Sequence, residues 1–322
     1  MATPKISDLK TYIGQLIDNT YWNFNFTKVT NWLTDATADL TFNSFTAGSD
    51  SSMGNAKITN LGTPTLATDA VNKGYVDIST IPAGYINGFT LTNNATTPNT
   101  DIDISAGTCQ SSANTQAIII TGTLTKRAST AWSAGTGNGM LDTGSIATST
   151  WYHIFAIAKA NGTSDILAST SSANPLLPTG YTVFRRIGSI KTDSSGHIIL
   201  FSQKGDYFMY NVGIVDVSIT TLPTDKTAYT LSVPPSTIAI FSAFLASGLN
   251  TGYHPIRFFE ASESDVAIGR TNSHLTANTN YANSGKFEIS INASSQISLK
   301  SNLTIGEVYI NTIGYIDMRG KN

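Results

Sequence analysis

The sequence predicts a mainly β protein with a short helical segment at its N-terminus. From residue 84 onward, runs of alternating or continuous β-branched and aromatic residues recur between turn-forming clusters, and no helical pattern separates them. Thr, Ser and Asn number 46, 35 and 26 of the 322 residues. Many short strands with frequent turns favour one or two antiparallel β-sandwich or jelly-roll domains over a parallel α/β sheet.

The low charge of the chain argues against two classes of partner. Charged residues make up 12% of the sequence, Lys and Arg total 19 against 21 Asp and Glu, and the formal net charge is −2. Because proteins that bind nucleic acid or anionic lipid usually concentrate basic charge, we expect neither partner. The most apolar stretch, residues 237–249, is shorter than the ~20 residues of a membrane span, so we expect no membrane insertion.

Cysteine usage limits the covalent and metal chemistry. Cys109 is the single cysteine, so the chain can form no intramolecular disulfide and no Cys-based zinc site. We expect it to be a small buried or incidental thiol. Residues 1–9 lack the apolar stretch of a secretory signal, so we expect a protein that is made without an export signal.

Residues 1–48 carry the helical character. Ser7 is placed to cap a helix that begins at Asp8, and the apolar residues that follow recur along one helical stripe, with several aromatic residues directly after them. A stripe this apolar on so short a segment predicts packing on a partner, and a helix folded back on its own domain is the alternative. The contact residues are expected to be Tyr12, Leu16, Trp22, Phe24 and Trp32.

Residues 49–83 form a connector between the helical segment and the β region. Its first part is extended and broken by a glycine and a proline. Asp69, or the threonine before it, then caps a brief helical turn over residues 70–76. That turn places Val71 and Tyr75 on one face at a spacing of four residues.

The remaining chain is expected to form two β domains. A cluster at residues 205–211, followed by a new set of strands, marks the expected boundary, which gives domains 84–210 and 211–322. The sequence Asp-Ser-Ser-Gly at 193–196 predicts a hairpin turn whose glycine adopts positive φ. Strands are expected at residues 101–105, 117–125, 150–158, 182–191, 197–203, 212–219, 237–245, 256–260, 286–291, 296–300 and 307–316.

No catalytic or metal-binding pattern stands out. The four histidines are too far apart for a local metal pair, and His153 lies in an apolar strand pattern that predicts a packed residue. Glu260, Glu263 and Asp265 form the densest carboxylate group, which is more typical of a solvated loop than of a glycosidase pair. The Gly-rich residues 135–139 lack the Lys-Ser/Thr ending of a phosphate loop. We therefore expect no enzyme, no cofactor and no metal.

The connector carries a specific resemblance to a known family. Residues 54–64 read GNAKITNLGTP and residues 67–77 read ATDAVNKGYVD. This pattern of KI-x-NL, a proline and then DA-x-x-K-x-YVD resembles a segment common in the fibre proteins of tailed bacteriophages. Gly74 stands where that family more often has Ala, Gln or Lys, and the segment occurs once rather than in tandem. Residues 151–203 are similar, less specifically, to a β-domain of phage virion proteins.

The resemblance implies a homotrimeric tail fibre of the virion, assembled in the cytoplasm of the infected host. The N-terminal segment would attach to the phage tail or to another virion protein. In a three-fold rod the apolar connector residues would be buried against their symmetry mates, because so short a segment cannot bury them alone. These trimer-stalk residues are Ile58, Leu61, Val71, Tyr75 and Val76.

The resemblance also implies that the C-terminal domain binds a glycan or protein of the host surface without covalent chemistry. Aromatic residues would stack on sugar faces, and polar side chains would bond hydroxyl groups. The candidates are Tyr253, His254 and Arg257 in one expected loop and Tyr281 in another. Two alternatives stay open: a head fibre or an adaptor that carries other fibres, and, less favoured, a polysaccharide depolymerase.

Overall fold

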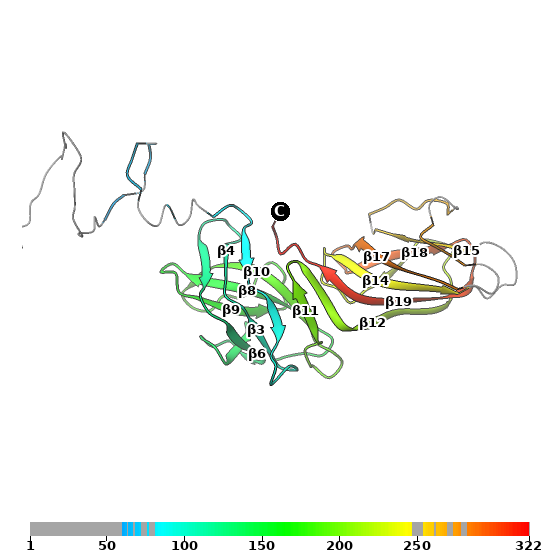
Figure 1. The fold of residues 1–322 in the computed structure, drawn as a ribbon, viewed down its shortest axis with the longest axis horizontal. Coiled ribbons are helices and arrows are strands. Elements are labelled where there is room, and N and C mark those ends of the chain that lie inside the picture. The colour runs from blue at the N-terminus through cyan, green and yellow to red at the C-terminus, as the bar shows by residue number, and fades with distance from the viewer. Residues whose placement is uncertain are drawn as a thin grey trace, which may run out of the picture. The chain divides into compact units, whose positions relative to one another are not determined.

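The computed structural model describes residues 60–62, 64–66, 68–71, 76, 81–246, 254–260, 262–268, 273–277 and 282–321. The chain divides into two units, residues 1–60 and 61–322. The described part contains nineteen strands in four sheets and no helical element, so the prediction of a mainly β fold is confirmed (Figure 1). The expected anchor residues Tyr12, Leu16, Trp22, Phe24 and Trp32 lie outside the described residues.

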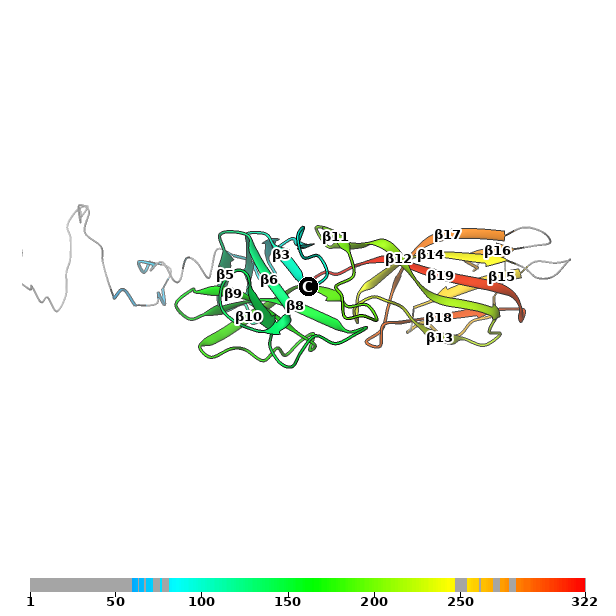
Figure 2. The same cartoon turned by 90° about the horizontal axis from the view of Figure 1, so that it is seen from below.

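Two sheets pack face to face as a first sandwich (Figure 2). One has seven strands in the order β10-β8-β9-β7-β6-β3-β2, and the other has three in the order β1-β4-β5. Residues of both sheets, among them Ile118 and Ile154, share one core. The strands are β1 Ile86–Gly88, β2 Leu91–Asn93, β3 Asp101–Ile104, β4 Gly107–Gln110, β5 Ala117–Ile120, β6 Leu124–Ala131, β7 Asn138–Leu141, β8 Trp151–Lys159, β9 Ser164–Ser169 and β10 Tyr181–Lys191.

A second sandwich follows. Its five-stranded sheet has the order β11-β12-β19-β14-β17, and its four-stranded sheet has the order β13-β18-β15-β16. Phe241 and Phe258 meet edge to face across the two sheets, with ring centroids 5.3 Å apart. The strands are β11 Phe201–Lys204, β12 Tyr207–Thr221, β13 Thr227–Thr230, β14 Ile238–Ala246, β15 His254–Phe259, β16 Leu275–Ala277, β17 Ala282–Ser290, β18 Gln296–Ser301 and β19 Ile305–Ile316.

Most strand pairs are antiparallel, as expected, but the first sandwich departs from this pattern at one place. The short strand β7 runs parallel to both of its neighbours, β6 and β9. The Gly-rich residues 135–139 lead into β7, and Gly135 and Gly137 both have positive φ, at 90° and 76°. These glycines let the chain turn from β6 into β7 over a very short connection.

The segment between the two sandwiches corrects one strand prediction. The hairpin turn at 193–196 is present, since Gly196 has a φ of 80° and its N–H donates to the Asp193 carbonyl at 3.1 Å. However, β10 and the chain after the turn share only the single bridge between Thr192 and Ile198. The next strand, β11, begins at Phe201 and pairs with β12. The sheets of the first sandwich therefore end at residue 191, and those of the second begin at residue 201.

Candidate functional site

Part of the connector is described, and it bears on the expected trimer stalk. Leu61, Val71 and Val76 are 36%, 51% and 37% exposed, whereas Ile58 and Tyr75 lie outside the described residues. Of the helical turn expected over residues 70–76, residues 72–75 lie outside the described part, and Val76 has helical conformation. The Asp69 carboxylate accepts the N–H groups of the preceding residues Thr65 and Leu66, at 2.7 and 2.9 Å.

The expected receptor loop is in part a strand. His254 and Arg257 both belong to β15, so the loop assignment was wrong for His254, whereas Arg257 falls in the strand expected at 256–260. Tyr253 and Tyr281 lie outside the described residues. His254 is 1% exposed, which removes its side chain from solvent. Neither of its ring nitrogens has a hydrogen-bond partner among the residues that the structure describes. Of the four candidates, Arg257 is the described residue that still lines an open surface.

Arg257 lines a polar cavity of about 350 Å³ on the second sandwich. The cavity lies where β15 and its following loop meet β17 and the segment before β16. Its walls combine cationic, anionic and aromatic side chains. The lining residues are Arg257, Phe258, Glu260, Glu263, His274, Glu288 and Ile289.

The guanidinium of Arg257 is held on two sides. Its Nη2 donates to Glu263 Oε1 at 2.5 Å, and its Cζ lies 4.8 Å from the Phe259 ring centroid, within cation–π range. The other oxygen of Glu263 accepts the Glu260 N–H at 3.1 Å. The Nε of Arg257 is buried and has no partner, so one donor of this fixed group is unused.

His274 supplies a second donor to the same cavity. Its Nδ1 accepts the Phe258 N–H at 3.0 Å, which places the proton of the neutral ring on Nε2. Burial and the charge of Arg257 lower the pKa of His274, although Glu263 opposes them, so the ring is neutral at pH 7. The cavity thus offers N–H donors beside carboxylate acceptors and an aromatic ring. This combination suits a ligand rich in hydroxyl groups, which both donate and accept.

The carboxylate group at residues 260–265 is a loop after a strand, as expected. Glu263 is engaged by Arg257, and Asp265 accepts Lys300 Nζ at 2.7 Å. Two of its three carboxylates are thus neutralised by cations from β15 and β18. This pairing holds the loop that forms the rim of the cavity.

A second, larger cavity of about 640 Å³ lies between the two sandwiches. The turn at 193–196 and the chain up to Leu200 form one wall, and β12 forms the other at residues 211–214. There β12 bulges, because its pairing with β19 is interrupted between Met209 and Ile214. The cavity is open and mixed in character, with His197 and Asn211 beside the apolar Leu200 and Val212.

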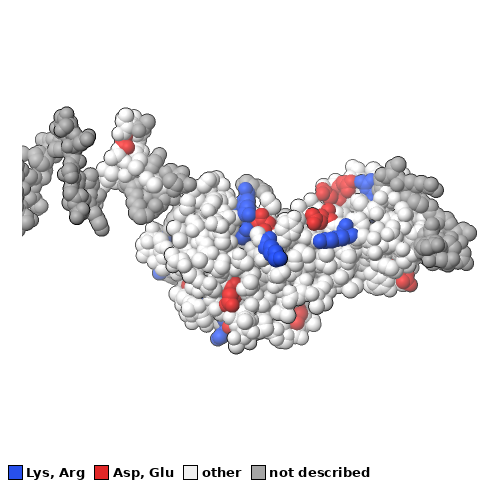
Figure 3. Space-filling model, in the orientation of Figure 1, with Lys and Arg blue, Asp and Glu red and all other residues white. Residues whose placement is uncertain are grey.

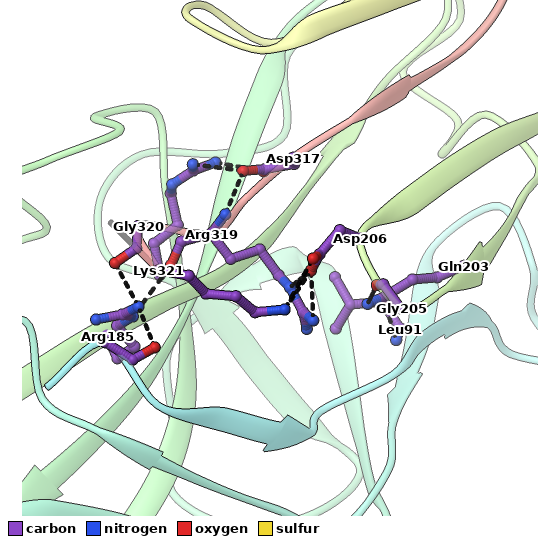
Figure 4. Close-up of polar contacts among 11 residues, drawn as sticks. Leu91, Arg185, Gln203, Gly205, Asp206, Asp317, Arg319, Gly320 and Lys321 are labelled. Carbon is purple, nitrogen blue, oxygen red and sulfur yellow. Dashed lines mark hydrogen bonds and ion pairs between the residues drawn. The ribbon is translucent and has the colours of Figure 1, made fainter. Parts of the chain in front are cut away.

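Residues 317–321, which follow β19, bind the turn between β11 and β12 and also the first sandwich through charged residues (Figure 4). Asp206, at the start of β12, accepts Arg319 Nη2 at 2.8 Å and Lys321 Nζ at 2.7 Å. Asp317 forms a two-pronged pair with Arg186 of β10, at 2.6 and 2.7 Å. We call these five residues the clasp. In Figure 3 most of the visible face is uncharged, and its charged side chains gather mainly on either side of a hollow over the junction.

Arg185 links the clasp to the beginning of the first sandwich. Its guanidinium is 4% exposed and donates to the carbonyls of Arg319 and Gly320, at 3.1 and 2.6 Å, and to that of Gly84 at 3.1 Å. On the opposite side of Asp206, the Leu91 N–H of β2 donates to the Gln203 side chain of β11 at 2.7 Å. Side-chain bonds therefore connect the two sandwiches at several points (Figure 4).

Apolar packing completes the junction. Tyr315 of β19 stacks on Phe208 with ring centroids 5.0 Å apart, and its hydroxyl donates to the Ser189 carbonyl of β10 at 2.8 Å. Gly188 lies beneath Phe208, and a Cβ at that position would be 3.0 Å from the Phe208 ring and 2.7 Å from Leu91. A larger residue here would therefore have to displace the Leu91 or Phe208 side chain at the junction.

A buried ion pair lies within the first sandwich, and sequence analysis did not find it. Lys126 Nζ lies 3.1 Å from Asp165 Oδ1, and their side chains are 0% and 3% exposed. Lys126 also donates to the carbonyls of Ser133 and Gly135, at 2.8 and 3.1 Å. Burial lowers the pKa of Lys126, while the charge of Asp165 raises it. The three acceptors match the three N–H donors of an ammonium, so this pair fixes the Gly-rich loop in place.

The isolated nucleophilic and basic side chains of the first sandwich are buried. Burial raises the pKa of Cys109 to about 12, which keeps the thiol protonated, and the prediction of a buried thiol is confirmed. His153 is 3% exposed, and its Nδ1 bonds Ser189 Oγ at 2.9 Å. Burial, with the charge of Arg186, lowers its pKa to about 4, so His153 is a neutral packed residue, as the apolar strand pattern predicts.

No protein-family model matches the chain, and no curated protein matches its sequence. Within the described residues no group of three or more His, Cys, Asp or Glu side chains is arranged to hold a metal ion. The same part of the chain contains no helix of the length and apolarity that a membrane crossing requires.

Proposed function

We propose that this chain is the subunit of a homotrimeric tail fibre of a tailed bacteriophage, and that it attaches the virion to the host cell surface. The observation that carries the proposal is the connector sequence at residues 54–77, which directly precedes two β-sandwiches joined by the clasp. A fibre must hold its successive domains in fixed positions relative to one another along its length. Charged and apolar contacts that join consecutive sandwiches suit that task.

The exposed side chains of the connector support the trimer. In the single chain Leu66 and Val71 expose 68% and 51% of their surfaces. Large apolar residues exposed together on a short segment are typical of a surface that a partner covers. Two further copies of the same segment around a three-fold axis provide that cover.

The cavity around Arg257 supports the attachment role. It holds a fixed guanidinium, a neutral histidine and carboxylates on one sandwich. Glycan hydroxyls are its best-matched ligand, since each can donate to Glu260 or Glu288 and accept from His274 or Arg257. Recognition of this kind needs no bond to be broken.

Labelling of intact particles tests the place of the protein on the virion. A gold-conjugated antibody against residues 201–321 is expected to decorate the tail tip or the tail side. Decoration of the capsid would contradict the tail-fibre assignment and support a head fibre or adaptor instead. A chain that lacks residues 1–48 is expected to form the same trimer and to be absent from particles, because the proposed anchor is missing.

Binding of the fluorescent full chain to host cells tests the site. Arg257→Met is expected to weaken binding at least about tenfold, which is the loss of one charge-assisted hydrogen bond. Arg127→Met is the control, since it also removes an arginine from one ion pair, but on the first sandwich, where Arg127 binds Asp101 away from the cavity. Equal binding by the two variants would reject the cavity as the receptor site. Release of oligosaccharides from host capsule, abolished by Glu260→Gln, would instead indicate a depolymerase.

A further inference from the structure

The solvent face of the five-stranded sheet departs from the usual pattern of an antiparallel sheet. Such a sheet normally alternates apolar residues toward the core with polar residues toward water. Here Val215, Phe244, Ile305 and Tyr309 point away from the core and are 62%, 37%, 50% and 39% exposed. We call these four residues the apolar strip.

The strand register places the four residues of the apolar strip on one face, with Glu307 between Ile305 and Tyr309. Tyr309 of β19 lies directly opposite Phe244 of β14, and their ring centroids are 6.1 Å apart. Val215 of β12 lies opposite Asn311, two residues along the same face from Tyr309. Ile305 is four residues from Tyr309 on the same strand and therefore also shares this face. The strip thus spans three neighbouring strands.

The other sheet of the same sandwich shows no such surface. Among the described residues of β13, β15, β16 and β18, no large apolar side chain is exposed. The two sheets of this sandwich therefore differ, although single apolar side chains such as Ile119 and Leu176 are also exposed in the first sandwich. An apolar patch on one sheet face marks an interaction surface.

Charged residues of both signs lie on the same face as the apolar strip. Lys286 of β17 and Glu307 of β19 lie opposite Ser242 and Ala246 of β14, and Glu288 lies two residues from Lys286. All three are exposed, and neither Lys286 nor Glu307 forms an ion pair with any described residue. A face that carries charges of both signs beside an apolar strip can pair unlike charges with a second copy of itself.

We propose that the apolar strip is the contact by which the second sandwiches of neighbouring copies pack together, with Lys286 of one copy near Glu307 of the next. This inference rests on the proposed trimeric fibre and names the surface that continues the trimer beyond the connector. Once the connectors are joined, the sandwiches are held at high effective concentration, so a modest apolar surface is sufficient.

Thiol labelling of the full chain tests the proposal. Ser218→Cys places a thiol on β12 directly opposite Tyr309, and Thr230→Cys places one on the exposed part of β13. Cys109 is buried and provides an unreactive background. With a polymer-linked maleimide under native conditions, the Ser218→Cys thiol is expected to react at least about tenfold more slowly than the Thr230→Cys thiol. Adding Tyr309→Lys to Ser218→Cys is expected to abolish most of this protection.

The molar mass of each variant, measured by light scattering, separates the outcomes. Equal labelling rates at a mass of three copies would overturn the inference and leave the proposed trimer intact, because the copies would then meet elsewhere. Slow labelling of the Ser218→Cys thiol at a mass of one copy would overturn it too, since the chain itself would cover the face. Equal rates at a mass of one copy would reject both the inference and the trimer.

Discussion

Replacing Asp206 by Asn tests whether the clasp stabilises the protein. Asp206 accepts Arg319 and Lys321 through two bonds to each, at 2.7–3.0 Å. The Arg319 side chain is 4% exposed, so the substitution leaves a buried guanidinium without its counter-ion. Loss of one partner of a buried pair costs about 3–5 kcal/mol, and the 21% exposure of Asp206 reduces this to roughly 2–4 kcal/mol.

The assay is urea unfolding of the full chain at pH 7, followed by tryptophan fluorescence. Asp225→Asn is the control, because Asp225 is exposed and its carboxylate forms no ion pair with a described residue. A change in unfolding free energy below about 0.5 kcal/mol for Asp206→Asn, equal to that of the control, would refute the clasp as a stabilising contact.

The pH dependence of the same variant gives a second check. Burial raises the pKa of Asp206, but the hydrogen bonds from Lys321 and Arg319 outweigh it and lower the pKa below 3.8. The native state therefore binds fewer protons than the unfolded state, and the stabilisation is present above the unfolded pKa and lost as the pH falls through the folded pKa. The difference between wild type and Asp206→Asn should shrink as the pH is lowered below 3.8.

Three further predictions concern buried side chains. The pKa of His153 is about 4 in the folded state against 6.5 in the unfolded state, so the roughly 3 kcal/mol by which the neutral buried ring favours folding should be lost as the pH falls from 6.5 to 4. His153→Asn should therefore flatten this part of a plot of urea midpoint against pH. An unchanged slope would contradict the prediction. Lys126→Met should cost about 3–5 kcal/mol in urea unfolding by stranding the Asp165 carboxylate, and adding Asp165→Leu should recover much of the loss; no recovery would argue against the pair. His254→Phe should raise stability by about 1–2 kcal/mol, because it removes a buried N–H without a partner, and a lower melting temperature would count against this.

The longer strands could be predicted because their patterns are strong. The segments around Trp151–Lys159 and Tyr181–Lys191 are continuous apolar or aromatic runs bounded by turns, and both strands begin and end within one residue of the expected positions. The short strands β1, β2, β4, β7, β13 and β16 were missed, because three or four residues are too few to show a period. The six-residue β9 was missed as well, and the eight-residue β6 was expected only at its first two positions.

The contacts of the candidate sites could not be predicted, because they depend on residues far apart in sequence. Arg186 and Asp317 are 131 residues apart in sequence. Lys126 of β6 pairs with Asp165 of β9, and strand β7 lies between these two strands. Local composition placed His254 in a loop, yet pairing with β16 makes it part of a strand. The sequence did predict that the candidate binding residues belong to the domain at 211–322 and that Arg257 is one of them.

The mass of the purified full chain in solution tests the central claim most directly. The claim is that three copies cover the apolar connector and continue as a fibre, so light scattering should give three times the 34.2 kDa of one chain, unchanged on dilution to nanomolar concentration. A stable, folded species of 34.2 kDa would contradict the account.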